Sequence, residues 1–161
     1  MTAAQILGSV VIAAIVTGAI KLVRDWRKRV HAEKVARRER LGPKFRELIG
    51  ICQNMQGVAT RLENDPAQEI AVEPDAIRQF RTRLDAIVEP DLAEMHKQVD
   101  DVLTEMTQWW GAATQVVGMT AQGQDVNPKI RNRIDDLAES VGGNLEPIKD
   151  ELKAQLTELE G

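Results

Sequence analysis

The segment "AAQILGSVVIAAIVTGAI", Ala3 to Ile20, contains no charged residue, and a strongly basic segment follows it directly. As an α-helix this run is about 27 Å long, close to the roughly 30 Å hydrocarbon core of a bilayer. Its aliphatic side chains favour insertion by roughly 2 to 5 kcal/mol, which the polar residues of the run reduce. The sequence therefore predicts a transmembrane helix over residues 1–20, with its apolar surface formed by Ile6, Leu7, Val10, Val11, Ile12, Ile15, Val16 and Ile20.

The same run is also compatible with a buried helix of an oligomer or with a cleaved signal peptide. The signal peptide is disfavoured because no basic residue precedes the apolar run and no small-residue cleavage site follows it. Small residues recur at four-residue spacing within the run, which lets two helices approach closely. They predict self-association through Gly8, Ser9, Ala13, Ala14, Thr17 and Gly18.

Residues 21–40 contain nine Lys/Arg and three Asp/Glu, whereas residues 41–161 contain 12 Lys/Arg and 22 Asp/Glu. Basic residues close to a span stay on the cytoplasmic side, so the N-terminus is expected outside and the C-terminal part inside the cell. Anionic lipid headgroups are expected to attract the same cations. We call this segment the basic collar; it comprises Lys21, Arg24, Trp26, Arg27, Lys28, Arg29, Lys34, Arg37, Arg38 and Arg40. A nucleic-acid role is not expected, because the segment lacks stacking aromatic residues and a recognisable binding fold.

Apolar residues in the remainder recur in steps of three and four, which is typical of helices that bury one face. A first helix is expected after Gly42-Pro43, and Pro-containing starts at 73–75 and 89–91 predict two more. Asn127 and Pro128 are typical of the N-cap and first residue of a last helix. Gly142, Gly143 and Pro147 interrupt that helix, but its apolar spacing continues, which favours a kink that preserves one continuous packing stripe.

The sequence thus predicts an all-α protein: a single transmembrane helix over 1–20, a basic juxtamembrane helix over 21–42, and an acidic cytoplasmic unit over 43–161. That last unit is expected to be an elongated antiparallel bundle or coiled coil, closed within one chain or between chains.

Trp109 and Trp110 are the most informative residues of the acidic unit. Neighbouring residues on a helix point about 100° apart, so both rings do not fit one narrow seam. One ring is expected in the core and the other at its margin or against a partner, unless a wide core takes both. Because Trp is enriched at binding hot spots, both residues are candidates for partner binding. The spacing of the apolar seam places Trp110 in it.

Motifs of nucleotide-binding, metalloprotease and serine-hydrolase sites are missing from the sequence. The single cysteine, Cys52, excludes an internal disulfide and a Cys-rich zinc site, and His31 and His96 are expected to be surface residues. We therefore expect no catalytic residue, no metal, no cofactor and no small-molecule substrate.

The function expected from these features is that of a non-enzymatic membrane scaffold, which presents its acidic helices to a protein partner or to copies of itself at the bacterial inner membrane. The alternatives are a holin-like phage protein that perforates the membrane, and a spanin-like envelope coiled coil, which requires the opposite topology.

Overall fold

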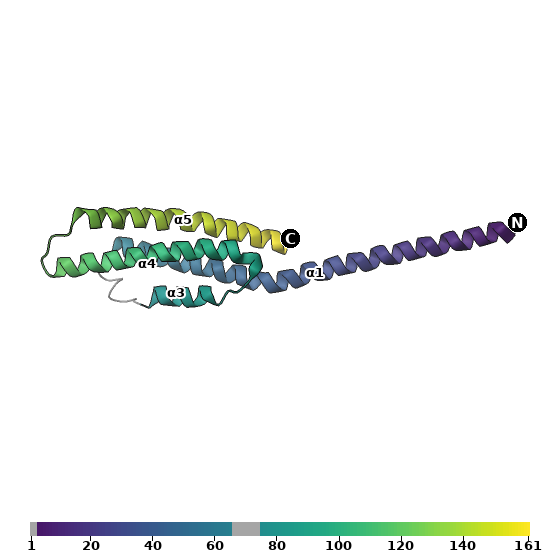
Figure 1. Cartoon of the computed structure of the whole chain (residues 1–161), viewed down its shortest axis with the longest axis horizontal. Helices are drawn as coiled ribbons and strands as arrows, with labels where there is room; N and C mark the ends of the chain where they lie inside the picture. Colours follow the sequence, from purple (N-terminus) through teal and green to yellow (C-terminus); the bar gives the residue numbers. More distant parts are fainter. Residues whose placement is uncertain (1–2, 66–74) are drawn as a thin grey trace. The chain divides into compact units, whose positions relative to one another are not determined.

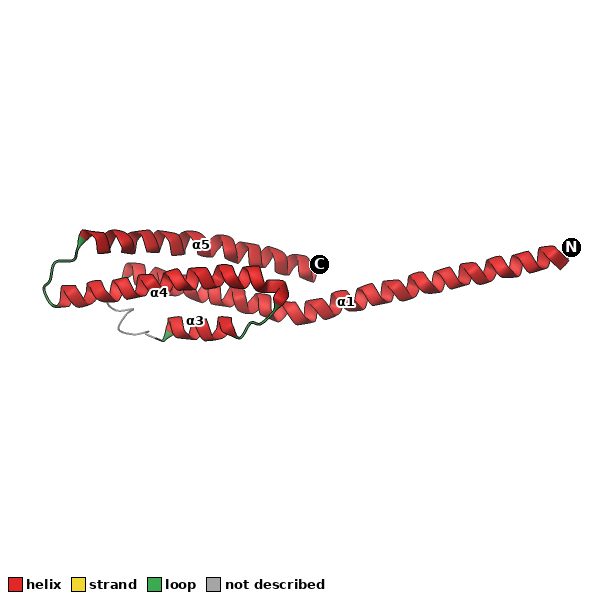
Figure 2. Ribbon diagram, in the orientation of Figure 1, coloured by secondary structure: helices red, strands yellow, loops and turns green. Residues whose placement is uncertain are grey.

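The computed structural model describes the backbone of residues 3–65 and 75–161 and the side chains of residues 21–65 and 75–161. The elements are α1 (Ala3–Asn64), α3 (Ala76–Asp85), the 3-10 helix η1 (Pro90–Leu92), α4 (Ala93–Ala121) and α5 (Pro128–Glu160) (Figure 1). Within these described ranges every regular element is helical, and no strand occurs (Figure 2). The expected all-α fold is confirmed.

The chain divides into two compact units, residues 1–41 and 42–161. In the first unit the backbone of residues 3–41 is helical, and the side chains of residues 21–40 are exposed except for Val30, which is half-buried. The side chains of the expected transmembrane helix, including its small-residue stripes, lie outside the described residues. Among the residues that the structure describes, no helix combines the length and the apolar character needed to cross a membrane. The transmembrane helix thus has no support from the structure and stays a prediction from the sequence.

The expected helix start after Gly42-Pro43 is wrong, because α1 runs through Pro43. A proline inside a helix removes one hydrogen bond to the preceding turn and costs about 3 kcal/mol. The Pro43 side chain is exposed, so its ring needs no space in the core. The burial of Phe45 and Leu48 immediately after it holds the following turns in helical register and offsets the cost.

The unit of residues 42–161 is an antiparallel bundle, as cross-helix hydrogen bonds show. Arg46 pairs with Glu160, whereas Gln56, further along α1, donates to Glu146 Oε2 at 3.1 Å. Because one residue number rises as the other falls, α1 and α5 run in opposite directions. The pairs Glu47–Arg83 and Lys44–Glu89 establish the same relation between α1 and the segment containing α3.

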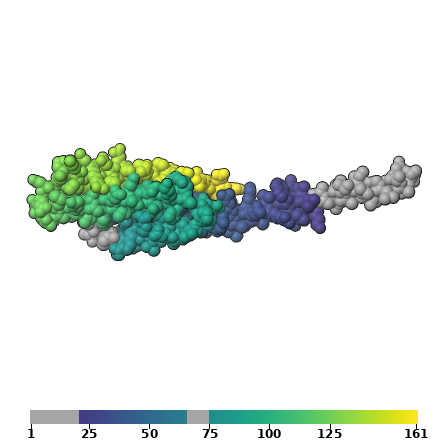
Figure 3. All heavy atoms as spheres, in the orientation of Figure 1, coloured from purple at the N-terminus to yellow at the C-terminus, as the bar shows by residue number. Residues whose placement is uncertain are grey.

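The core of the bundle is formed by apolar side chains from all of its helices, and the atoms of α4 and α5 meet along their lengths (Figure 3). Complete removal of these side chains from water is the main stabilising contribution, at about 1.5 to 3 kcal/mol for each large residue. The largest fully buried side chains in the bundle are Leu48, Ile51, Met55, Leu62, Leu84, Leu92, Val99, Leu103, Met106, Leu145 and Leu152.

The last helix, α5, begins and continues as the sequence predicts. The side chain of Asn127 accepts a hydrogen bond from the Lys129 backbone N–H at 2.9 Å, and Pro128 is the first helical residue. The helix is unbroken at Pro147, and the buried Val141 and Leu145 lie on the stripe that the spacing predicts. An exposed proline is tolerated here because the apolar stripe on the opposite face stays packed.

Candidate partner-docking groove

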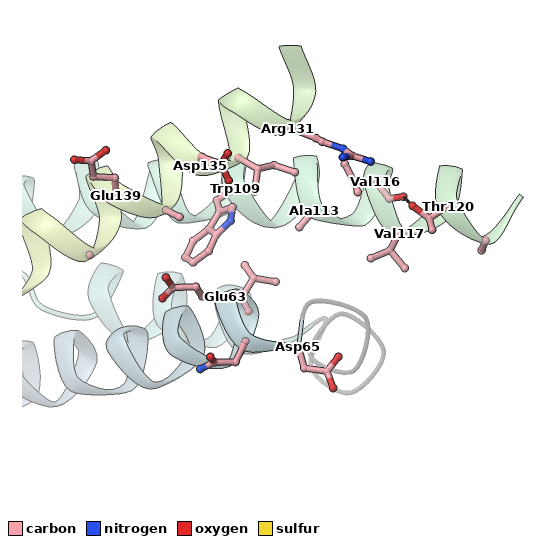
Figure 4. A pocket seen from close by; sticks show the side chains of 16 residues that line it. Glu63, Asp65, Trp109, Ala113, Val116, Val117, Thr120, Arg131, Asp135 and Glu139 are labelled. Carbon is pink, nitrogen blue, oxygen red and sulfur yellow. Dashed lines mark hydrogen bonds between the residues drawn. The ribbon is translucent and has the colours of Figure 1, made fainter. Parts of the chain in front are cut away.

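A cavity of about 1140 Å³ lies where α4 and α5 continue beyond the end of α1 (Figure 4). Its walls are the C-terminal half of α4, the N-terminal half of α5 and the last residues of α1. We call it the distal groove; it is lined by residues 62–65, Trp109, Ala113, Val116, Val117, Thr120, Ala121, Arg131, Ile134, Asp135, Ala138, Glu139 and Gly142.

The floor of the distal groove is apolar because the core-facing stripe of α4 continues past α1. Trp109 and Ala113 are each only 3% exposed, and the Trp109 ring extends from α4 into the cavity (Figure 4). Val116 and Val117, one turn further along, are only half-buried, as is Ile134 on α5. Aliphatic residues at core spacing that stay half-buried form a prepared but incompletely covered apolar surface.

The rim of the distal groove is acidic. Glu63 contributes a carboxylate from α1, and Asp135 and Glu139 contribute two more from α5, beside one cation of the lining, Arg131 (Figure 4). These three carboxylates and one guanidinium have a formal charge of -2 together. Low-dielectric walls strengthen the field of such a rim at the mouth of a groove, so the groove attracts cations.

The two tryptophans lie as a helix requires, one inside and one at the margin. Trp109 is buried, and Trp110 is half-buried. The placement of Trp110 in the seam was therefore wrong by one residue. Gly111 is exposed, and a Cβ at this position would have no atom of the described residues within 4 Å, so it marks no helix contact in that part of the chain. A role in partner binding stays a prediction for both tryptophans.

The residues of the basic collar are exposed on α1, in the unit of residues 1–41. Trp26 is 64% exposed, and the apolar Leu22 next to the collar cations is 73% exposed. An exposed indole and aliphatic side chain among cations are typical of a surface that contacts lipid headgroups. The collar and the distal groove belong to different units, so they are two separate candidate surfaces.

The buried polar side chain of Lys149 has hydrogen-bond partners within the bundle. Lys149, almost completely buried, donates to Gln56 Oε1 at 2.9 Å and to the carboxylate of Glu146. The hydrogen bond from Lys149 lowers the pKa of Glu146, so the pair loses its charge complementarity as the pH falls through that pKa.

His96 is half-buried, not a surface residue as expected, and its Nε2 lies 3.0 Å from the Leu84 carbonyl oxygen. Within residues 21–65 and 75–161, no group of three or more His, Cys, Asp or Glu side chains could hold a metal ion.

Cys52 is expected to react slowly with thiol reagents. Burial raises the pKa of its thiol to about 11, and Lys149 offsets only part of that rise. At pH 8 the thiolate fraction is then roughly 200-fold below that of an exposed cysteine with a pKa of about 8.5, and the 1% exposed side chain hinders access further. Titration with a chromogenic disulfide reagent should show this slow reaction in the folded chain and a fast one in guanidinium chloride.

The matched control for that titration places a thiol at an exposed position of the same unit. The variant Cys52→Ala/Gly111→Cys carries its cysteine where a side chain meets no neighbouring atom. It should react at the rate of a free thiol in the folded state. Equal rates for the two proteins would contradict the burial of Cys52.

The distal groove was not predicted from the sequence, although part of its signal was visible. The small residues after the Trp pair, Gly111, Ala112 and Ala113, permit close approach of another helix, and Ala113 does line the groove. Comparison with known proteins gives no further assignment: no family model, no curated protein and no solved structure matches the chain.

Proposed function

We propose that this protein is a non-enzymatic scaffold, anchored to the bacterial inner membrane by residues 1–20, that holds an acidic helical unit at the cytoplasmic face for assembly with a protein partner. The distal groove is the single observation that carries the docking part of this proposal. It joins a large apolar floor to an acidic rim, whereas each buried side-chain polar atom in the described part of the bundle has a hydrogen-bond partner. Apolar surface of this kind is typical of protein interaction sites.

The membrane part of the proposal rests on the sequence and on the exposure of the collar. The uncharged run is long enough to cross a bilayer, and the exposed cations after it orient it with the C-terminal unit inside the cell. The groove belongs to the unit of residues 42–161, which lies on the C-terminal side of both features. A partner in the cytoplasm can therefore reach it.

The packed bundle also favours the scaffold over a membrane-perforating protein, since a perforator needs no extensive folded unit with a docking groove. Induced expression in bacteria tests this choice. We expect the chain to resist extraction by alkaline carbonate, while a potential-sensitive dye reports an unchanged membrane potential and growth continues. Rapid depolarisation after induction would contradict the scaffold and support the holin-like alternative. Release by carbonate would contradict the membrane anchor.

A further inference from the structure

The distal groove is long enough to hold a short α-helix. On α4 its lining extends from Trp109 to Ala121, which corresponds to about 18 Å, or a little more than three helical turns. The α1 helix ends at Asn64, so in the described part of the chain no helix covers this portion of the α4–α5 pair. Within the described residues no helix continues α1 past Asn64, and a short additional helix at that position would extend the bundle.

The volume of the groove fits several side chains better than one small molecule. Pockets for small ligands are about 300 to 1000 Å³ and enclose most of the ligand. The distal groove, at about 1140 Å³, exceeds this range and is bounded by three helices. An amphipathic helix that inserts residues from one face, at positions i, i+3, i+4 and i+7, uses such a groove efficiently.

The charge of the rim identifies the chemistry of that helix. Glu63, Asp135 and Glu139 line the groove beside its apolar floor, and Arg131 balances only one of these three charges. We propose that the distal groove binds an amphipathic helix of a protein partner, with its apolar face on the half-buried Val116, Val117 and Ile134 and with Lys or Arg residues against the acidic rim. This inference deepens the proposed function, on which it rests, by naming the class of partner.

The probe is a synthetic peptide of about four to five helical turns, with Leu along one face and Lys at the other positions. The protein is the full chain in nanodiscs of zwitterionic lipid, with empty discs as the blank and fluorescence anisotropy of a labelled peptide as the readout. We expect saturable binding of the Leu/Lys peptide. A Leu/Glu peptide of the same pattern, and a Leu/Lys peptide with its Leu residues scattered around the helix, should bind at least tenfold more weakly.

The variant Val117→Glu separates groove binding from attraction to an acidic surface. It places a charge on the apolar floor while it makes the protein more negative. Docking in the groove predicts at least tenfold weaker binding of the Leu/Lys peptide, because the carboxylate must lose its water under an apolar face. Equal or tighter binding would show that the peptide merely adheres to negative charge, and it would overturn the proposal.

A charge reversal provides a second test that misfolding cannot mimic. The double variant Asp135→Lys/Glu139→Lys should bind the Leu/Lys peptide about tenfold more weakly than the unaltered chain does. It should bind the Leu/Glu peptide about tenfold more tightly. The matched control is Glu94→Lys/Asp101→Lys, which changes the net charge equally at exposed positions on α4 outside the groove. If both double variants change binding equally, the rim has no special role and the proposal is wrong.

Two further outcomes are decisive. If single-copy discs associate with one another, and Val117→Glu prevents that association, the occupant is a second copy of this chain and the proposal of a separate partner is overturned. If the chain does not enter the discs, the membrane anchor of the proposed function fails. The same titration on the free chain then still decides whether the groove takes a basic helix.

Discussion

Replacing Trp109 with Ala is expected to lower the free energy of unfolding by about 3 to 5 kcal/mol, the cost of removing a large buried aromatic side chain from a core. The Trp109 ring is 3% exposed and lies between α4 and the end of α1 (Figure 4). Its loss joins the space of the ring to the distal groove and leaves the neighbouring side chains without contacts. Urea denaturation followed by circular dichroism at 222 nm measures the change.

The adjacent Trp110 supplies the matched control, because Trp110→Ala removes the same atoms from the same helix. Trp110 is half-buried, so we expect a loss of only about 1 kcal/mol. The difference between the two variants also tests the rotation of α4 about its axis. If Trp110→Ala were the more damaging change, the seam would follow the assignment made from the sequence spacing, and the groove would lack its floor.

Introducing two lysines at Val11 and Ile12 is expected to abolish membrane insertion. A lysine at the centre of a transmembrane helix costs about 2.5 to 3.5 kcal/mol, so two cost about 5 to 7 kcal/mol. This exceeds the roughly 2 to 5 kcal/mol that the aliphatic residues of the run supply. Membrane flotation in a density gradient should therefore find the variant outside the membrane fraction, where the unaltered chain is retained.

The control for this variant places two lysines at exposed positions of the collar helix, as in Ala32→Lys/Ala36→Lys. The added charge is the same, but it lies beside other cations and outside the uncharged run. This control should float with the membrane as the unaltered chain does. If the Val11→Lys/Ile12→Lys variant also floats with the membrane, then residues 1–20 do not form the anchor.

The helical class and most helix positions could be predicted because apolar residues three and four apart describe a buried face independently of the partner helix. The same rule failed where α1 has neighbours on more than one side. The spacing predicts one buried stripe formed by Phe45, Leu48, Ile49, Cys52, Met55, Ala59 and Leu62. Ile51 and Val58 are buried although they lie off this stripe, while Ile49, which lies on it, is half-buried. A helix with partners on two sides buries a wider stripe than one face.

The choice between the two tryptophans shows a limit of spacing arguments. From the buried Met106, a step of three leads to Trp109 and a step of four leads to Trp110, so both fit a helical seam. Only the packing of α4 against the neighbouring helices decides between them. Trp109 is selected because its ring fills the space beside the end of α1.

The distal groove could not be predicted because it depends on where helices end relative to one another. Val117 and Ile134 read in the sequence as ordinary core residues. They become the wall of a groove because α1 stops at Asn64 while α4 and α5 continue. That offset is a property of the three-dimensional register of the bundle, which spacing within one helix does not encode.

The most direct test of the central claim, that the acidic unit is held at the cytoplasmic face of the membrane, is protease accessibility of a C-terminal tag. Spheroplasts expose the outer face of the inner membrane, and inverted vesicles expose the cytoplasmic face. We predict cleavage of the tag in inverted vesicles and protection in intact spheroplasts. Cleavage in spheroplasts would contradict the account, because it would place the distal groove outside the cytoplasm and favour the envelope coiled coil.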